Sequence, residues 1–387
     1  MTDPQSFLPY GRHSIDEEDV AAVVAVLRGG MLTQGPEIDA FEADVARAVG
    51  ARFAVAFSNG TAALHAACAA LGLGPEDEVI TTPFTFSASA NCVRYVGAKP
   101  VFVDVEPVAG TIDPELVARA IGPRTRAIIP VHFAGQPARM NDLSALAQQH
   151  GLAIIEDAAH ALGATYRGEP IGDGKRAAMA MFSFHPVKHV TTGEGGAITT
   201  NDEALRDKLR LFRTHGITRD PRLLTRPSPG PWYQEQIMLG YNYRLTGLQA
   251  ALGQSQLKKL GRFVSRRREL AAKYDAMFEG VKGIRPLGRL EGTEHAFHIY
   301  VARIDFEGLG RSRAAVMEAL KARGIGTQVH YVPVHLHPDY AFLGLGEGAF
   351  PVTERIYTES LTLPLFPAMN DGDVDRVVGA LREVLGV

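Results

Sequence analysis

Residues 152–160 read LAIIEDAAH, and this stretch decides the fold class. Its apolar run is typical of a strand buried on both faces of a parallel sheet. The run ends in acidic residues, so Asp157 falls at the carboxyl end of the strand. Ligands of open α/β sheets bind outside that end, and a buried carboxylate there needs a cationic partner. The stretch therefore predicts an α/β fold whose ligand carries a positive charge beside Asp157.

Further strand-like runs alternate with helical segments on both sides of this stretch. The expected strands span residues 53–57, 78–81, 100–105, 127–131, 153–156, 179–184 and 197–200, the last as an antiparallel edge strand. Such a βαβ series predicts a mostly parallel seven-stranded sheet. Asp113 and Pro114 are expected to open one helix, and Ser14 another that continues to Leu27. A long helix over residues 245–278 is expected to divide a large domain, 1–255, from a smaller C-terminal α/β domain, 256–387.

A lysine about thirty residues downstream stands in an unusual setting. Residues 182–189 read FSFHPVKH and run into TTGEGG at 191–196, so Lys188 sits before a glycine-rich turn. A lysine that holds a carbonyl cofactor as a Schiff base needs a lowered pKa and a close backbone, whereas a solvated surface lysine needs neither. Opposite charges about 4 Å apart attract by roughly 4 kcal/mol at an effective dielectric of about 20, so Asp157 would keep a pyridine ring protonated. Lys188 and Asp157 together indicate pyridoxal 5′-phosphate (PLP), whose protonated ring withdraws electrons.

A phosphate site is expected where the first strand meets its helix. Residues 58–64 read SNGTAAL, and free N–H groups at a helix N-terminus bind anions. Thr61 and Ala62 are placed to donate to a phosphate, and the hydroxyl of Ser183 could join them. Phe86 could stack on the cofactor ring, although an aromatic residue near a strand end is more often core.

In this order, the motifs SNGTAA, EDAAH, SFHPVK and TTGEGG resemble the PLP-dependent nucleotide-sugar aminotransferases of the DegT family over nearly the whole chain. The resemblance implies PLP-dependent transferase fold type I, as in aspartate aminotransferase, L-glutamate as amino donor, and a homodimer with two shared active sites. It implies that Lys188 binds the cofactor covalently and that Asp157 pairs with the pyridine nitrogen. The other cofactor residues that it implies are Phe86 and His160 on the ring, Thr61, Ala62 and Ser183 on the phosphate, and Asn242 on the phosphate of the neighbouring subunit.

Residues 131–137, 185–188, 215–219 and 231–233 are similar to the branch of this family that acts in pseudaminic acid biosynthesis. That likeness implies amination at C4 of UDP-4-keto-6-deoxy-N-acetyl-L-hexosamine. Synthesis of GDP-perosamine or of a dTDP-amino sugar is the alternative within the family. The nucleotide-sugar pocket implied by the resemblance consists of Tyr10, Leu32, Thr33, Gln34, Gly35, His185, Asn242, Gln328, His330 and Tyr331.

Two rival functions come from other classes of protein. Residues 330–339 read HYVPVHLHPD, and alternation would place His335 and His337 on one face, as in a zinc-dependent hydrolase. That hypothesis supplies no carboxylate cage and leaves the lysine turn unexplained, so no metal is expected. A non-catalytic regulator that keeps only the fold is expected to lose Lys188 or Asp157, and both are present. Relatives that replace the lysine by histidine become dehydratases, so Lys188 favours transamination.

Composition fits an enzyme that is not built for nucleic acid or membranes. The 387 residues are 46% hydrophobic and carry a net charge of −3, which gives no basic field. The only tight cationic run, residues 266–268, is expected on a solvent-facing side of a helix. Cys68 and Cys92 are expected to be buried free thiols, which indicates a cytoplasmic enzyme. No basic leader and no run of eighteen apolar residues is evident, so neither secretion nor membrane spanning is expected.

Overall fold

The computed structural model describes residues 7–387 and is built around a seven-stranded sheet of order β1-β9-β8-β5-β4-β2-β3. Its strands are β1 (Phe53–Phe57), β9 (Gly196–Thr200), β8 (Met179–Ser183), β5 (Ala153–Asp157), β4 (Thr125–Ile129), β2 (Glu78–Thr81) and β3 (Lys99–Phe102). The pairs from β8 to β3 are parallel, whereas β9 is antiparallel to both of its neighbours. The prediction of a mostly parallel seven-stranded sheet is confirmed.

The predicted place of the antiparallel strand is wrong. β9 lies inside the sheet, and β1 and β3 form the edges. The chain turns back after β8, so β9 pairs with it as Ser183↔Gly196 to Ala180↔Thr199. β1, the first strand in sequence, then covers the other side of β9, so β9 has two partners.

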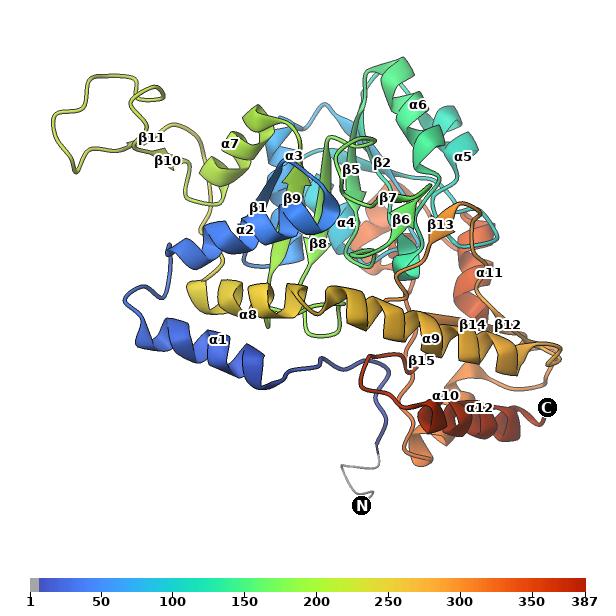
Figure 1. Cartoon of the computed structure of the whole chain (residues 1–387). Coiled ribbons are helices and arrows are strands. Elements are labelled where there is room, and N and C mark those ends of the chain that lie inside the picture. The colour runs from blue at the N-terminus through green and yellow to red at the C-terminus, as the bar shows by residue number, and fades with distance from the viewer. Residues whose placement is uncertain (1–6) are drawn as a thin grey trace.

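Helices cover both faces of this sheet (Figure 1). Along β1, Ala54 and Ala56 face one apolar core, and Val55 and Phe57 face the other. The first core includes side chains from α2 (Pro36–Val49), α5 (Pro114–Ala120), α6 (Met140–His150) and α8 (Gly247–Leu257); the second includes α3 (Gly60–Ala70), α4 (Ala88–Tyr95) and α7 (Glu203–Phe212). Strands buried on both faces explain why β1, β5 and β8 read as continuous apolar runs.

Of the two predicted helix starts, one is confirmed and one is wrong. Asp113 caps α5 by accepting a hydrogen bond from the N–H of Glu115 at 2.9 Å, as predicted. The predicted capping box at Ser14 is wrong, because α1 (Glu17–Arg28) is capped by Asp16, whose side chain accepts from the N–H groups of Glu18 and Asp19. The Asp16 carboxylate thus accepts from the free N–H groups of the first turn of a helix that starts two residues later than predicted.

The long helix expected over residues 245–278 is divided into α8 and α9 (Leu260–Phe278). The break falls at Lys258 and Lys259, where the N–H of Lys259 bonds to the carbonyl of Gln256. The Lys259 side chain is buried, and its ammonium lies 3.0 Å from Asp19 of α1. The turn between α8 and α9 thus carries a buried lysine that pairs with α1.

The C-terminal part adds a second, smaller sheet with its own core. The sheet has the order β12 (Ile284–Pro286), β14 (Tyr300–Ile304), β15 (Ser360–Leu363), and its pairs are antiparallel. The helices on it are α9, α10 (Arg313–Ala322), α11 (Pro351–Glu359) and α12 (Asp371–Leu385). Leu8 packs in this core, whereas Phe263 of α9 packs in the first. The domain boundary between residues 255 and 256 stays a prediction. Residues from each side of this boundary pack in the core of the other side.

The remaining elements are short. They are β6 (Thr165–Tyr166), β7 (Glu169–Pro170), β10 (Ile217–Thr218), β11 (Glu235–Gln236), β13 (Thr293–Glu294), and the 3₁₀ turns at Phe133–Gly135, Val334–Leu336 and Pro338–Leu343. Cys68 and Cys92 are buried free thiols, as predicted. Within residues 7–387, no helix has the length and apolar character needed to cross a membrane.

Candidate active site

Asp157 ends β5 at the carboxyl edge of the sheet, where the sequence places it. Its carboxylate is buried and accepts hydrogen bonds from the Ser89 hydroxyl at 2.6 Å and from the N–H of Ala159 at 3.2 Å. Burial raises the pKa of Asp157, whereas Ser89, Ala159 and the charge of Lys188 act against that rise. A cation placed against this carboxylate would favour its ionised form.

Lys188 follows β8 on a turn in which its N–H bonds to the carbonyl of His185 at 2.9 Å. Its side chain is partly buried, and the ammonium nitrogen Nζ lies 3.3 Å from Nε2 of His298. The pKa of Lys188 is lowered to about 8: burial is the largest cause, the charge of Asp157 opposes it, and the charge of Arg267 adds to the lowering. The neutral and nucleophilic form of the amine is therefore accessible near neutral pH.

A group of aromatic side chains lies next to this amine. His160 and His298 are buried with ring centroids 4.2 Å apart, and Nε2 of His160 lies 3.1 Å from the hydroxyl of Tyr331. Phe86 is largely exposed, and its ring lies 5.8 Å from that of Tyr331. Burial is the main cause that lowers the pKa of both histidines, and the charge of Lys188 adds to it. Both imidazoles are therefore uncharged near neutral pH.

The predicted phosphate site lies at the start of α3. Asn59 caps this helix, and its side chain accepts from the N–H of Ala62 at 2.8 Å, so one of the two predicted donors is already engaged. Within residues 7–387, no hydrogen bond engages the N–H of Gly60 or Thr61. A Cβ added at Gly60 would lie 3.5 Å from Oγ of Ser183, so this hydroxyl faces the helix start. Two free N–H groups and one hydroxyl thus converge, as an anion site requires.

Four of the predicted sugar-binding residues lie together beside the imidazole group. The rings of Tyr10 and His330 are 5.4 Å apart, and Tyr331 contacts His160 as described. Nδ1 of His330 lies 2.9 Å from the hydroxyl of Thr362, and Gln328 pairs with the backbone of the same Thr362. The structure therefore brings Tyr10, Gln328, His330 and Tyr331 to one side of Lys188.

Other predicted residues lie elsewhere in the chain. Leu32 to Gly35 pack against the start of α8, where the carbonyl of Leu32 accepts from the N–H of Gly247 and Thr33 pairs with Thr246. His185 and Asn242 are exposed, and neither side chain has a hydrogen-bond partner within the described residues. The carbonyl of Tyr243, next to Asn242, accepts from the N–H of Ser58 just before α3. Asn242 thus lies near the edge of its own chain's phosphate site.

Three residues of the site escaped sequence reasoning: Ser89, His298 and Arg267. The expectation that residues 266–268 form a solvent-facing run is wrong for Arg267, which is 1% exposed and donates to the carbonyls of Phe297, His298 and Leu365. The buried guanidinium of Arg267 is bonded to the segment that carries His298 and places a positive charge near Lys188. The signal in the sequence was that residue 267 is arginine and not lysine, since the several N–H groups of a guanidinium can donate to several buried carbonyls at once.

The histidine run at residues 330–339 does not form a metal site. His330 bonds to Thr362, and Nε2 of His335 lies 3.0 Å from a carboxylate oxygen of Glu354. Over residues 7–387, no group of three or more histidine, cysteine or acidic side chains is arranged to hold a metal ion. These imidazoles have separate partners, so the arrangement gives the hydrolase hypothesis no support.

A lysine of lowered pKa, a buried carboxylate and an anion site at one sheet edge define an enzyme that works through a phosphorylated carbonyl cofactor. The chain belongs to the DegT/DnrJ/EryC1/StrS aminotransferase family, whose model matches residues 13–382. It is 43% identical to the spore coat polysaccharide biosynthesis protein SpsC of Bacillus subtilis, over 98% of this chain and 97% of that protein.

Solved structures extend the comparison. Helicobacter pylori PseC, described as an aminotransferase involved in the biosynthesis of pseudoaminic acid, superposes with a TM-score of 0.90 at 31% identity, covering 98% of this chain and 99% of that one. DesV of S. venezuelae superposes with a TM-score of 0.87 at 38% identity, covering 96% and 95%. The protein is therefore a PLP-dependent sugar aminotransferase with the PLP-dependent transferase fold type I.

The residues at the sheet edge fit this cofactor. Asp157 is a buried carboxylate, and each of its oxygens accepts one hydrogen bond and can accept another from a cationic ring nitrogen. Gly60 and Thr61 offer free N–H groups to a phosphate. In the described part of the chain, Nδ1 of His160 is buried without a partner, as is Nδ1 of His298. Unpaired buried polar atoms are costly, so these two nitrogens beside Lys188 would gain from a partner in a bound ligand.

Proposed function

We propose that this enzyme transfers the amino group of L-glutamate to the C4 keto group of a nucleotide-linked 4-keto-6-deoxy sugar, with UDP-4-keto-6-deoxy-N-acetyl-L-hexosamine as substrate. The observation that carries the choice of sugar is the full-length likeness to PseC. The product would serve pseudaminic acid biosynthesis. Synthesis of GDP-perosamine or of a dTDP-amino sugar is the second candidate, because identity to PseC is 31% and DesV, whose description does not mention pseudaminic acid, is 38% identical.

We infer the roles of the residues from their contacts. Lys188 is the covalent anchor and, once released, the base that moves the α-proton of glutamate, since its pKa of about 8 leaves the amine available. Asp157 would pair with the ring nitrogen, and Thr61, Ala62 and Ser183 would hold the phosphate, with the N–H of Ala62 shared with the Asn59 side chain. His160 and Phe86 would contact the ring. When bound, PLP supplies an electron sink for the carbanion that deprotonation leaves.

The sugar would bind beside Tyr10, Gln328, His330 and Tyr331, which lie together next to His160. Leu32 to Gly35, His185 and Asn242 do not join this group within one chain, so we assign them to the nucleotide side of the pocket and to a second subunit. A homodimer would complete the site in this way. The two unpaired cysteines support a cytoplasmic enzyme.

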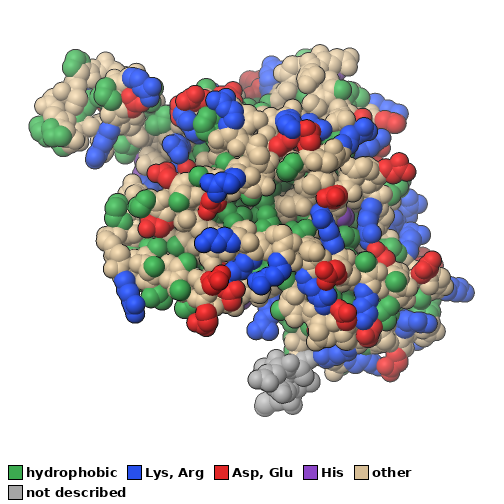
Figure 2. All heavy atoms as spheres, viewed as in Figure 1, with side chains coloured by type: hydrophobic (Ala, Val, Ile, Leu, Met, Phe, Trp, Pro, Cys, Tyr) green, Lys and Arg blue, Asp and Glu red, His purple; other side chains and the backbone are tan. Residues whose placement is uncertain are grey.

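The projecting segment around β10 and β11 supports the dimer. It extends away from the body of the molecule at the upper left of Figure 1, and Figure 2 shows apolar side chains on its surface. Trp232 and Leu239 are 70% and 74% exposed, and Leu223 is 43% exposed. Large apolar side chains that are exposed together mark contact surfaces. A second copy of the chain is the occupant that the proposal assigns to them.

An absorbance titration tests the function. The purified enzyme should be yellow, lose that band on addition of L-glutamate, and regain it with one member of a panel of UDP-, GDP- and dTDP-4-keto-6-deoxy sugars. Recovery with the UDP-linked N-acetylhexosamine supports the proposal, and recovery only with a GDP or dTDP sugar replaces it by the second candidate. Bleaching by glutamate with no recovery by any sugar would contradict the sugar substrate while leaving the aminotransferase class intact.

A further inference from the structure

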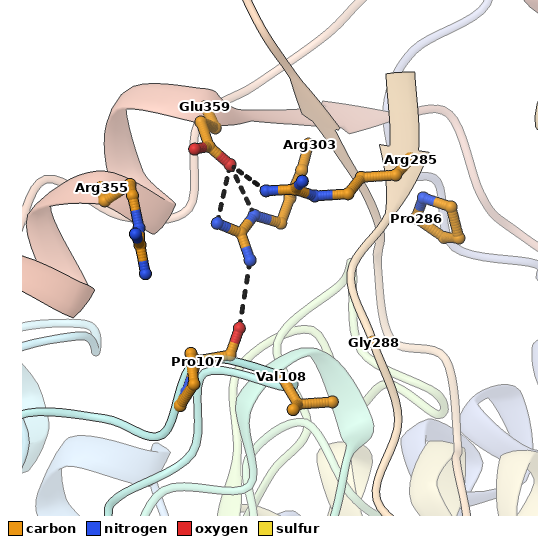
Figure 3. A pocket seen from close by; sticks show the side chains of 8 residues that line it. All are labelled: Pro107, Val108, Arg285, Pro286, Gly288, Arg303, Arg355 and Glu359. Carbon is orange, nitrogen blue, oxygen red and sulfur yellow. Dashed lines mark hydrogen bonds and ion pairs between the residues drawn. The ribbon is translucent and has the colours of Figure 1, made fainter. Parts of the chain in front are cut away.

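A second charged cavity lies away from Lys188, between the large sheet and the small one. It has a volume of about 420 Å³. Its lining residues are Pro107, Val108, Arg285, Pro286, Gly288, Arg303, Arg355 and Glu359. Figure 3 shows the side chains of Arg303 and Arg355 on one side of this space and the loop with Pro107 and Val108 on the other. None of these residues belongs to the group around Lys188.

The charges that line the cavity do not balance. Glu359 is its only acidic lining residue, and one of its oxygens accepts from Arg285 at 2.9 Å and from Arg303 at 2.8 Å. The guanidinium of Arg355 forms no hydrogen bond or ion pair with any residue of the described chain, and Figure 3 shows no interaction from it. Three guanidinium groups thus line the cavity with one carboxylate, which pairs with only two of them. The neighbouring Glu106 is turned into its own loop, where it accepts from the N–H groups of Val108, Ala109 and Thr111.

One of the three cations is buried, which makes the imbalance costly. Arg303 is 7% exposed and also donates to the carbonyl of Pro107 at 3.1 Å. Burial lowers the pKa of Arg303, and the charges of Arg285 and Arg355 also lower it, whereas Glu359 opposes them. An anion in the cavity would compensate this positive charge and would offer acceptors to the unused N–H groups.

We propose that this cavity binds the phosphate group of a small phosphorylated molecule. Arginine forks bind phosphate through paired, charge-assisted hydrogen bonds, and three guanidinium groups match the several oxygens of one phosphate better than a single carboxylate does. The volume lies in the range of small-molecule sites and leaves space beyond the phosphate for an organic part. Pro107, Val108 and Pro286 offer that part an apolar wall.

Such a ligand would connect two parts of the molecule. Pro107 and Val108 follow β3 of the large sheet, whereas Arg285 and Arg303 lie on β12 and β14 of the small sheet, and Arg355 lies on α11. The parts already touch at this point, because the N–H of Gly288 donates to the carbonyl of Val108 at 3.0 Å. A bound phosphate would add charged contacts to this junction and would raise the thermal stability of the enzyme.

The first test is residue-specific chemical protection in the PLP-loaded enzyme. Phenylglyoxal modification of Arg355, followed by peptide mass spectrometry, should slow by about tenfold when inorganic phosphate is present at about ten times its dissociation constant. Arg28 of α1 is the matched control, because its side chain is also exposed and forms no hydrogen bond or ion pair with the described residues, so its modification rate should not change. An unchanged modification rate of Arg355 at saturating phosphate overturns the proposal. Protection by glutarate, a dicarboxylate, without protection by phosphate also overturns it.

The second test compares Arg355→Gln with Arg28→Gln by calorimetric titration of the loaded enzyme with pyrophosphate. The Arg355 guanidinium forms no hydrogen bond or ion pair with the described residues, so its substitution should leave the fold intact and weaken binding by about tenfold, whereas Arg28→Gln should bind like the wild type. Binding that survives Arg355→Gln and is competed by a nucleotide sugar would place the anion in the active site and overturn the proposal. The outcome is independent of which sugar the enzyme aminates.

Discussion

At Lys188 two opposing electrostatic effects set the reactivity of one amine. Burial and the charge of Arg267 favour the neutral amine, whereas Asp157 favours the charged one. The net result is a pKa of about 8, below the ordinary 10.5 of lysine. In the unfolded chain the amine stays protonated to higher pH, so folding of the free enzyme carries a cost below pH 8 that disappears as pH rises from 8 to 10.5.

The reactivity of Lys188 in the cofactor-free protein should follow this pKa. Labelling with trinitrobenzene sulfonate, measured peptide by peptide, should rise with pH to a midpoint near 8 at Lys188, because only the neutral amine reacts. Lys258 is exposed and serves as the control for access of the reagent. Asp157→Asn should move the Lys188 midpoint to lower pH, since the opposing charge is lost. A Lys188 midpoint near the ordinary lysine value of 10.5 would refute the electrostatic account.

Substitution of Lys188 separates binding from chemistry. Lys188→Ala should retain PLP without a covalent bond, because Asp157 and the start of α3 are untouched, and should lose turnover by at least about a thousandfold. Borohydride reduction followed by mass spectrometry should attach the cofactor to the wild type and to Lys258→Ala but not to Lys188→Ala. Turnover of Lys188→Ala near that of Lys258→Ala would remove Lys188 from both of its proposed roles.

At the scale of elements, the strand β9 and the start of α3 approach so closely that only glycine fits between them. A Cβ at Gly196 would lie 2.6 Å from the carbonyl oxygen of Asn59 and 2.7 Å from the nitrogen of Gly60. Gly196 also pairs with Phe57 on one side and Ser183 on the other. The glycine therefore fixes the position of the free N–H groups relative to the Ser183 hydroxyl.

Gly196→Ala should move the start of α3 and lower the free energy of unfolding by about 1–3 kcal/mol, as overpacking does. PLP affinity, measured by titration of the cofactor-free protein, should fall as well. Gly261→Ala is the matched control: Gly261 is exposed in α9 with no atom near its added Cβ, and alanine there should stabilise by about 0.5–1 kcal/mol. Urea unfolding that leaves Gly196→Ala as stable as the wild type would show that the backbone can yield.

Local pattern predicted the residues whose role depends on their own strand or helix. Asp157 at a strand end, Asn59 to Ala62 at a helix start and Lys188 before a glycine turn were all visible along the chain. Ser89 and His298 were not, because their importance comes from contacts with Asp157, 68 residues away, and Lys188, 110 residues away. The inner place of β9 was missed for the same reason, since pairing with β1 is not encoded near β9. The resemblance to a family supplied what local pattern left open.

At the scale of the whole molecule, the position of Asn242 leaves a specific question. Its neighbour Tyr243 contacts Ser58 beside the phosphate site of the same chain, yet the apolar projecting segment around β10 and β11 and the resemblance point to a partner subunit. Asn242 can therefore serve its own site or that of a second copy. In a two-fold dimer the two possibilities give different results when two damaged chains are mixed.

Subunit mixing decides between them. Lys188→Ala and Asn242→Asp should each be nearly inactive, the second because its carboxylate repels the cofactor phosphate. If Asn242 acts across the interface, each mixed dimer contains one site with both native residues, so random mixing should restore about a quarter of wild-type activity. If Asn242 acts within its own chain, every site in the mixture keeps one damaged residue and activity should stay at the background of the separate variants. Mixing Lys188→Ala with itself, after the same dissociation and reassociation, controls for recovery that has nothing to do with shared sites. If the measured mass is that of a dimer but mixing restores no activity, the protein is a homodimer in which Asn242 serves the site of its own chain.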